Sequence, residues 1–299
     1  MDSKNKSILF MLAATGLYSV NDAFAKLVVT DYPVAHFFFI RSLFTLIILL
    51  PFLRSKSKRQ EIAVKLKLNV FRSSVAAGGT MLMFWTLKFM PLTDCRLLFF
   101  TSPLFAFLLA KPILKEKLSS LAFLSVLLGF VGASVVAFPG YDVVDPIALI
   151  VLGAAFLLGL SNVISRKLTF NTTAYSVSFN YTVVSLILSS IFFLSDMRMP
   201  NWDQLLLIVM MSIINLSAQY GIINAFKYGE VNAVAPLEYV ELIYMMILGY
   251  MIWGDIPTIK LLMGAFLVLV SGILTIYHKS ILKEKSLTEL GPGKLKKVA

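Results

Sequence analysis

The sequence predicts an all-α membrane protein whose ten transmembrane helices form two inverted five-helix repeats. Three observations predict this fold class. Apolar side chains make up 58% of the 299 residues and charged side chains only 14%, whereas soluble domains average about 45–50% and about 25%. The apolar residues gather in ten long runs, and the second half of the chain repeats features of the first half. Together these observations exclude a water-soluble globule.

Each predicted span is an apolar run of about 17–25 residues, the length that an α-helix needs to cross the hydrocarbon core. Short connections separate the runs, and several contain prolines that end a helix, such as Pro33, Pro91 and Pro257. In chain order the predicted spans are Ile8–Val28, Pro33–Leu53, Asn69–Phe89, Asp94–Leu114, Leu121–Pro139, Asp145–Ser165, Thr173–Leu194, Gln204–Ala225, Asn232–Ile252 and Thr258–His278.

The distribution of Lys and Arg predicts the orientation of the chain. Most of these residues lie in the amino terminus, in the connections that follow even-numbered spans and in the carboxyl tail. Positively charged connections stay on the cytoplasmic side, so we expect both termini in the cytoplasm and the protein in the bacterial inner membrane. The net charge of +11 follows from this topology, and no nucleic-acid partner is expected.

The two halves of the chain match at an offset of 139 or 140 residues. Asn21-Asp22 followed by Lys26 matches Ser161-Asn162 followed by Arg166, and further matches follow in the same order. Each half holds five spans, an odd number, so the second half enters the membrane from the opposite face. Inverted repeats of this kind are typical of secondary transporters, whose substrate site lies between the two halves.

The repeat divides the chain into three parts: a first five-helix repeat at residues 1–139, a second at residues 140–280 and a basic cytoplasmic tail at residues 281–299. The first apolar run, with Ala23-Phe24-Ala25 near its end, imitates a signal peptide with a cleavage site. Because the same run is the first span of the repeat, we expect it to remain uncleaved.

Asp22 and Arg41 are ionisable residues inside the first two spans. Such side chains cost at least about 2.5–3.5 kcal/mol each in hydrocarbon, so each needs a partner or a hydrated cavity. Asp22 lies about 9 Å and Arg41 about 12 Å from the outer face, at about 1.5 Å per residue. Similar depth on consecutive antiparallel spans predicts an Asp22–Arg41 ion pair. The pair either fixes the hairpin or acts as a gate or proton-sensitive switch.

The ninth span carries two carboxylates, Glu238 and Glu241, whose spacing places them on one helical face that Tyr244 continues. Their depth places Glu241 near the membrane midplane. No cation lies in the same span, so the pair predicts a site for a cationic substrate group or for a proton. The alternative is an ion pair with an arginine of the first half: Arg41, Arg72 or Arg96.

Neutral polar and aromatic residues of other spans extend the candidate site. Polar side chains at intermediate depth are typical either of a shared cavity or of hydrogen bonds between helices. Trp85 either offers its ring face to a cation or packs against neighbouring helices. The candidate substrate-binding residues are Tyr18, Asp22, Arg41, Trp85, Asn162, Gln219, Tyr220, Glu238, Glu241 and Tyr244.

The sequence does not support a metal centre, a cofactor or an enzyme. Cys95 is the only cysteine, and His36 and His278 lie far apart at interfaces. No nucleotide-binding or hydrolase motif is present, so transport would run on a gradient or by exchange. An intramembrane enzyme acting on lipid-linked substrates would have only Asp22 and the two glutamates for its chemistry. A channel is disfavoured because no re-entrant filter loop is present.

Over roughly residues 8–278 the chain resembles EamA-type members of the drug/metabolite transporter superfamily. Ala235-Pro236-Leu237-Glu238-Tyr239 at the start of the ninth span and Gly254-Asp255-Ile256-Pro257-Thr258 at its end carry this resemblance. Within the superfamily, Ser19-Val20-Asn21-Asp22 and Phe39-Ile40-Arg41-Ser42 are similar to the S-adenosylmethionine uptake carriers of obligate intracellular bacteria.

The resemblance implies a secondary transporter of a small polar metabolite with a central cavity. S-adenosylmethionine uptake or exchange is the leading expectation, and export of amino acids or related amines is the alternative. Coupling to protons or to exchange is compatible with the sequence, as is a monomer or a homodimer. The expected contacts are Glu241 and Glu238 to the substrate cations, Arg41 or Arg96 to its carboxylate, and Trp85 or Tyr220 to its adenine.

Overall fold

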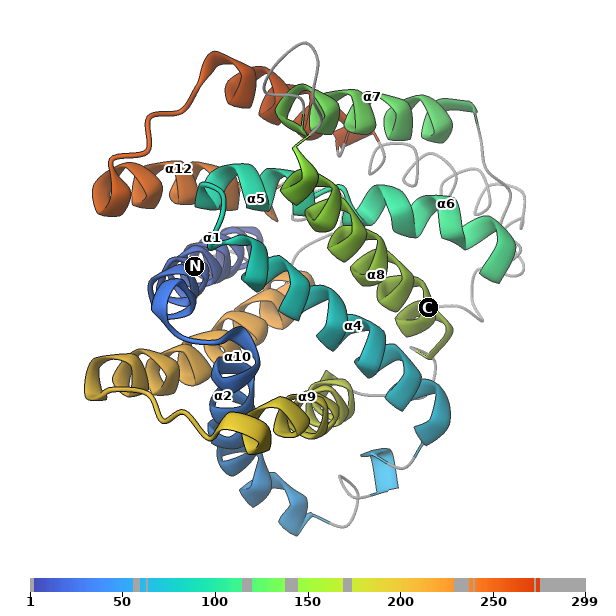
Figure 1. Cartoon of the computed structure of the whole chain (residues 1–299). Coiled ribbons are helices and arrows are strands. Elements are labelled where there is room, and N and C mark those ends of the chain that lie inside the picture. The colour runs from blue at the N-terminus through green and yellow to red at the C-terminus, as the bar shows by residue number, and fades with distance from the viewer. Residues whose placement is uncertain are drawn as a thin grey trace, which may run out of the picture.

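The computed structural model describes residues 3–55, 60–62, 64–114, 120–137, 145–168, 174–228, 237–238, 240–271 and 273–274. Within these ranges every regular element is a helix (Figure 1). This confirms the predicted all-helical class. The predicted basic tail, residues 281–299, lies outside the described residues.

The helices follow the predicted spans closely, with end points that differ by a few residues in most cases. In chain order they are α1 (Ser3–Asp31), α2 (Val34–Leu49), η1 (Leu50–Arg54), α4 (Leu66–Thr86), α5 (Leu92–Phe99), α6 (Ser102–Leu114), α7 (Ser120–Ala137), α8 (Pro146–Leu168), α9 (Ala174–Asp196), α10 (Trp202–Tyr228), α12 (Val240–Trp253) and a last helix over Ile259–Ser271.

The described helices have an apolar surface, as membrane spans do. Large apolar side chains face outward, including Ile191 at 66% and Phe266 at 65% exposure, whereas Ser19 and Asn69 are buried. This distribution is the inverse of what water favours. Five stretches are long and apolar enough to cross a bilayer: Asn5–Asp31, Leu92–Ala110, Pro146–Ser165, Tyr175–Asp196 and Trp202–Ala225.

Prolines explain two departures from straight spans. The second span passes from α2 into the 3-10 turn η1, whose second residue is Pro51. The fourth span bends between α5 and α6, because Pro103 has no N–H to donate to the carbonyl of Phe99. The Thr101 N–H still donates to the Leu98 carbonyl at 3.1 Å. The span therefore bends while its hydrogen bonding continues across the break.

The ninth span is described only in part. Leu237 and Glu238 form a 3-10 turn, and α12 begins at Val240 and carries Glu241 in its first turn. Glu238 therefore lies outside α12, and the single α-helical face predicted for the two glutamates is not observed. Residues 232–236 and 239, which belong to the same predicted span, lie outside the described residues.

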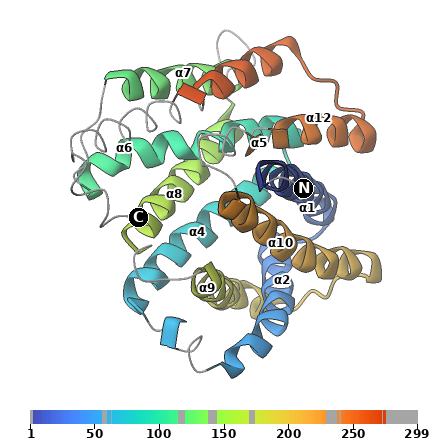
Figure 2. The same ribbon diagram turned by 180° about the vertical axis from the view of Figure 1, so that it is seen from behind.

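Contacts between helices of the two halves follow a reciprocal pattern (Figure 1, seen from behind in Figure 2). The first span, α1, packs along the eighth, α10, and the third span, α4, packs along the sixth, α8. The second span, α2, packs on the seventh, α9. In the predicted repeat α1 corresponds to α8, α4 to α10 and α2 to α9. The contact of α1 with α10 therefore corresponds to that of α8 with α4, and the contact of α2 with α9 corresponds to itself.

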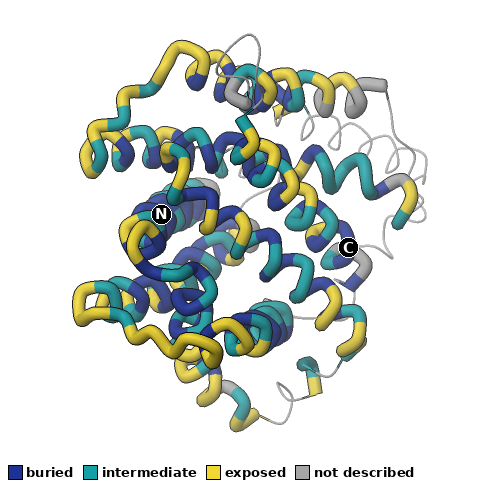
Figure 3. The backbone as a smooth tube through the Cα atoms, in the orientation of Figure 1, coloured by how far each residue is buried: buried dark blue, intermediate teal, exposed yellow. Residues whose placement is uncertain are grey.

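Small residues permit the close approach of these helices. A Cβ atom at Gly221 of α10 would lie 2.9 Å from the Cβ of Ala14 in α1, and a Cβ at Gly79 of α4 would lie 2.9 Å from the carbonyl oxygen of Ala154 in α8. Such glycine contacts are typical of helix packing in membranes. Figure 3 shows buried residues along the inner faces of the helices and exposed residues at the rim.

Candidate functional site

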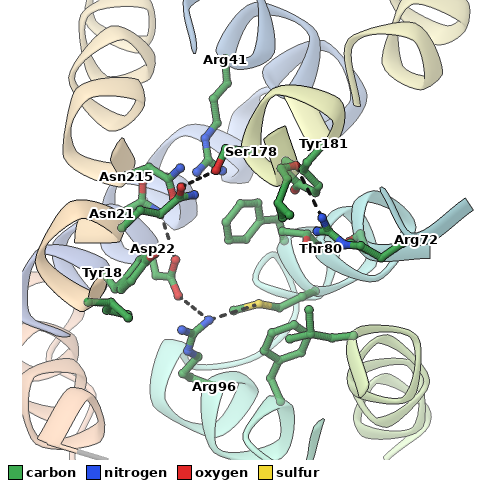
Figure 4. Close-up of a pocket in the computed structure, with 18 of the residues that line it drawn as sticks. Tyr18, Asn21, Asp22, Arg41, Arg72, Thr80, Arg96, Ser178, Tyr181 and Asn215 are labelled. Atoms are coloured by element: carbon green, nitrogen blue, oxygen red, sulfur yellow. Dashed lines mark hydrogen bonds and ion pairs between the residues drawn. The ribbon is translucent and has the colours of Figure 1, made fainter. Parts of the chain in front are cut away.

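A cavity of about 470 Å³ lies among α1, α2, α4, α5, α8, α9 and α10 (Figure 4). Its volume falls in the range of about 300–1,000 Å³ that is typical of small-molecule sites. Helices from both halves of the chain line it. The reciprocal packing of α1 with α10 and of α4 with α8 therefore places this cavity where the two halves meet.

Arg96 of α5 forms the charged floor of the cavity. Its Nη1 atom lies 3.1 Å from Oδ2 of Asp22 in α1, and its Nη2 atom donates to Oε1 of Glu241 in α12 at 2.7 Å. The three side chains are at most 15% exposed. Two carboxylates thus share one guanidinium, whose planar fork of donors suits such a bridge. The network joins one helix of the second half to two helices of the first.

The predicted Asp22–Arg41 ion pair is wrong, because Asp22 pairs with Arg96 instead. The similar depth of Asp22 and Arg41 in the membrane did not determine the pair, since α5 brings the guanidinium of Arg96 to the same side of α1. Arg41 lies over aromatic rings, with its Cζ atom 5.7–6.0 Å from the ring centroids of Phe37, Phe38 and Phe84.

Glu241 is buried behind Arg96 and is not part of the cavity lining. Its backbone carbonyl also accepts a hydrogen bond from Ser19 Oγ of α1 at 3.2 Å. The first turn of α12 favours a negative charge because of its unsatisfied N–H groups. Of the two interpretations open from the sequence, the structure shows the ion pair with an arginine of the first half.

Arg41 and Arg72 also reach the cavity, from α2 and α4 (Figure 4). Arg72 donates from Nε to Ser161 Oγ at 3.3 Å and from Nη1 to the Val177 carbonyl at 3.5 Å. Within the described ranges, no carboxylate oxygen lies within 4.0 Å of either guanidinium. The upper part of the cavity in Figure 4 is therefore cationic.

A polar wall between α9 and α10 faces Arg41. Ser178 Oγ donates to Gln219 Oε1 at 2.7 Å, and Tyr181 and Asn215 lie beside them. A second cavity of about 20 Å³ adjoins this wall and Arg41. It is large enough for about one water molecule. Hydroxyl and amide groups of α9 and α10 therefore line the cavity on this side.

Apolar and aromatic side chains form the remaining walls. Phe84 of α4 and Phe99 of α5 line one side, and Ile222 of α10 lines another. Tyr18 of α1 and Tyr181 of α9 add rings with hydroxyl groups. Flat rings beside fixed charges suit a ligand with an aromatic or apolar body and an ionised end.

A second ion pair lies on α1 about one turn from Asp22, toward the predicted outer face. Lys26 Nζ lies 3.7 Å from Oδ2 of Asp255, which follows α12, and 4.5 Å from the ring centroid of Trp253. Together with the Arg96 network, this contact ties α1 to α12 in two layers on the outer side of the cavity.

The structure brings only some of the predicted site residues into the cavity. Tyr18, Asp22, Arg41 and Gln219 line it. Glu241 lies one layer behind. The remaining five are outside the lining: Tyr244, whose ring packs on Gly16, half-buried Glu238, and the exposed Trp85, Asn162 and Tyr220.

Trp85, Asn162 and Tyr220 were each assigned one residue too far along the chain. Their preceding neighbours Phe84 and Gln219 line the cavity, and Ser161 accepts a hydrogen bond from Arg72. Consecutive residues of a helix point about 100° apart at about 3.6 residues per turn. The following side chain therefore faces outward, and Tyr220 is 65% exposed.

Sequence reasoning did not assign Ser178 and Tyr181 of α9 to the site. A signal was present, because the polar residues Ser176, Ser178, Asn180 and Thr182 follow one another at the start of this span. Arg72 was considered only as an ion-pair partner for the glutamates, and Arg96 also as a contact of the substrate carboxylate. Both also line the cavity.

Comparison with known proteins identifies one family. The model of the EamA-like transporter family matches residues 5–138 and, a second time, residues 145–277. A solved structure, described only as a crystal structure of a protein, is similar with a TM-score of 0.62 and 18% identity, over 93% of this chain and 99% of that chain. That likeness concerns the fold alone.

Several relatives are named as transporters, each of a different substrate. The riboflavin transporter of Vibrio cholerae is 25% identical, over 76% of this chain and 77% of its own length. The S-adenosylmethionine uptake transporter of Rickettsia prowazekii is 24% identical, over 91% and 92%. The pseudopaline exporter CntI of Pseudomonas aeruginosa is 24% identical, over 91% and 96%.

Proposed function

The chain belongs to the EamA-like transporter family, and from this premise we propose that it carries a small polar metabolite across the bacterial inner membrane by alternating access. The cavity between the two halves is the substrate site. The observation that carries this proposal is a volume of about 470 Å³ lined by both halves, with fixed charges of both signs and aromatic walls. The family and its named relatives are transporters, which argues against an enzyme.

The ten-helix inverted repeat is part of the proposal. Two features support it: the family model matches the chain twice, at residues 5–138 and 145–277, and the packing of α1 with α10 reappears as that of α8 with α4. Two similar halves can rock about a site between them, which is the usual basis of alternating access.

The arrangement of the cavity supports an inward-facing state. Arg72 and Val177 lie near the first residues of α4 and α9, and Ile223 lies near the last residues of α10. With both termini in the cytoplasm, these helix ends are cytoplasmic. The Arg96 network and the Lys26–Asp255 pair then close the outer side. Opening that side requires α1 to separate from α12.

S-adenosylmethionine, taken up or exchanged, is the proposed substrate. Relatives named for this activity cover most of the chain, and the molecule carries a sulfonium, an ammonium, a carboxylate and a flat adenine. Asp22 replaces Glu241 as the acid that faces the cations, because Glu241 does not line the cavity. Arg41 faces the carboxylate, and Phe84 or Tyr181 flanks the adenine. A proton or a counter-substrate drives the cycle.

Uptake by the purified protein in liposomes tests this function. We expect uptake of labelled S-adenosylmethionine, and Asp22→Asn should lower it by at least about tenfold, which corresponds to about 1.4 kcal/mol of binding. The outward-facing variants Trp85→Phe and Tyr220→Phe are matched controls that should keep wild-type uptake. Absence of uptake by folded wild-type protein would contradict the proposed substrate.

The alternative is export of amino acids or related amines. A relative named as an exporter, with similar identity over most of the chain, favours keeping this candidate. Liposomes loaded with labelled amino acids and diluted into label-free buffer separate the two directions. Efflux that depends on Asp22, without uptake of S-adenosylmethionine, would establish the alternative.

A further inference from the structure

The charges around the cavity do not balance in pairs. Arg96 is matched by two carboxylates, Asp22 at 3.1 Å and Glu241 at 2.7 Å. Arg41 and Arg72 have no carboxylate within 4.0 Å among the residues that the structure describes. Arg72 is buried and Arg41 half-buried, and cations inside a membrane protein are costly without an anion or water beside them.

The two guanidiniums face one region of the cavity. Arg41 comes from α2, Arg72 from α4 and Tyr181 from α9, and all three side chains line the same cavity. Figure 4 shows Arg41 and Arg72 approaching from different sides, with Tyr181 and Ser178 between them and Arg96 on the far side. Arg41, Arg72 and Tyr181 therefore enclose a common space.

Both side chains keep hydrogen-bond donors for a ligand. A guanidinium has five N–H donors, and Arg72 uses Nε and Nη1 for Ser161 and the Val177 carbonyl. The described contacts of the Arg41 guanidinium are with the rings of Phe37, Phe38 and Phe84. Planar guanidiniums bind carboxylate and phosphate through paired, nearly parallel hydrogen bonds.

We infer that Arg41 and Arg72 form an oxyanion subsite that binds a carboxylate or phosphate group of the transported molecule. This inference rests on the proposed transport function and narrows its substrate class to molecules with an oxyanion at one end. The ring of Phe99, which lies 5.6 Å from the Arg96 guanidinium on the far side of the cavity, holds the other end. The subsite recognises S-adenosylmethionine by its carboxylate and would recognise other amino acids and nucleotides in the same way.

Matched ligand pairs that differ in one anionic group test the subsite. Thermal stabilisation of the purified full-length protein is measured with S-adenosylmethionine against its decarboxylated form, tryptophan against tryptamine, and flavin mononucleotide against riboflavin. The first two pairs report a carboxylate and the third a phosphate. In every pair that gives a shift, we expect the anionic member to bind at least about tenfold more tightly. The inference is overturned if the member without the anionic group binds equally or more strongly, or if no pair shifts the melting temperature.

The two proposals fail in distinguishable ways. If the S-adenosylmethionine pair is silent while another pair shows a preference for the anionic member, the proposed substrate is wrong and the subsite stands. If S-adenosylmethionine is transported but its decarboxylated form binds equally well, the function stands and the subsite is wrong.

Substitutions locate the preference on the two arginines. Arg41→Gln and Arg72→Gln should remove the preference for the member with the anionic group and leave binding of the member without it within about twofold, while Arg41→Lys keeps part of the preference. Arg198→Gln, an exposed cation outside the cavity, is the control and should change nothing. A preference that survives both Gln variants overturns the assignment.

Thermal unfolding without ligand separates a binding role from a structural one. Arg41→Gln removes a half-buried cation that has no described carboxylate partner, so its melting temperature should be no lower than that of the wild type. Arg96→Gln leaves two buried carboxylates without their cation, and its melting temperature should fall strongly. A fall for Arg41→Gln as large as that for Arg96→Gln would assign Arg41 to the framework and overturn the inference.

Discussion

Glu241 is the residue whose interpretation changes most between sequence and structure. Glu241 does not line the cavity. Its carboxylate instead accepts a hydrogen bond from Arg96 at 2.7 Å in a buried network. Asp22 shares the same cation at 3.1 Å. Glu241 therefore joins α12 to α5 and α1 through the Arg96 network.

Glu241→Gln should consequently destabilise the protein. The substitution removes one charge-assisted hydrogen bond while Asp22 continues to balance Arg96, so we expect a loss of about 1.5–3 kcal/mol. Glu238→Gln is the matched control, because Glu238 lies in a half-buried turn outside this network, and it should cost less than about 1 kcal/mol. Thermal unfolding in detergent measures both. Equal effects of the two variants would contradict the assigned role.

At the residue scale, the sequence identified which helix faces carry polar groups but not which neighbour points inward. Asp22, Arg41 and Gln219 line the cavity, whereas Trp85 and Tyr220 follow an inward-facing residue and face outward. A membrane helix with an apolar majority has a weak amphipathic pattern, so its rotation is set by neighbouring helices. The ion-pair partner of Asp22 could not be predicted from the sequence either, because it depends on how α5 packs against α1.

At the element scale, two adjacent glycines of α4 have opposite environments. A Cβ at Gly79 would lie 2.9 Å from the Ala154 carbonyl oxygen and 3.1 Å from the Leu157 Cβ atom of α8, whereas a Cβ at Gly78 would meet nothing within 4 Å. Of these two glycines, only Gly79 therefore serves the close packing of α4 against α8.

Gly79→Ala should force α4 away from α8 and cost about 1–3 kcal/mol. Gly78→Ala should be neutral or stabilising by about 0.5–1 kcal/mol, since alanine favours the helix. Both are measured as melting temperatures in detergent, and ligand binding reports whether the cavity wall shifts with α4. A larger loss from Gly78→Ala than from Gly79→Ala would show that the α4–α8 packing is not as described.

The elements themselves were largely predictable, because length and apolarity determine membrane spans. The departures come from local chemistry and from the fold. Pro103 bends the fourth span, an effect that its position allowed one to foresee. The start of α12 at Val240, which leaves Glu238 in a turn, had no comparable signal. Apolar periodicity alone predicted a longer helix there.

At the scale of the whole molecule, the repeat in the sequence predicted where a cavity would form. The reciprocal contacts of α1 with α10 and of α8 with α4 agree with that expectation. The charge of the cavity lining was not predictable, since it depends on which of the three arginines forms ion pairs with the carboxylates. Arg96 pairs with both Asp22 and Glu241, and no carboxylate oxygen of the described residues lies within 4.0 Å of the Arg41 or Arg72 guanidinium.

The most direct test is the accessibility of Thr80, which lines the cavity on α4. In Thr80→Cys protein, a membrane-impermeant maleimide should react from the cytoplasmic side, and S-adenosylmethionine should protect the thiol. Two negative controls are available. One is the wild-type protein, whose single cysteine Cys95 is buried, and the other is Tyr220→Cys, at a residue that faces outward. Labelling that matches these controls, or that added substrate leaves unchanged, would contradict a substrate site between the two halves.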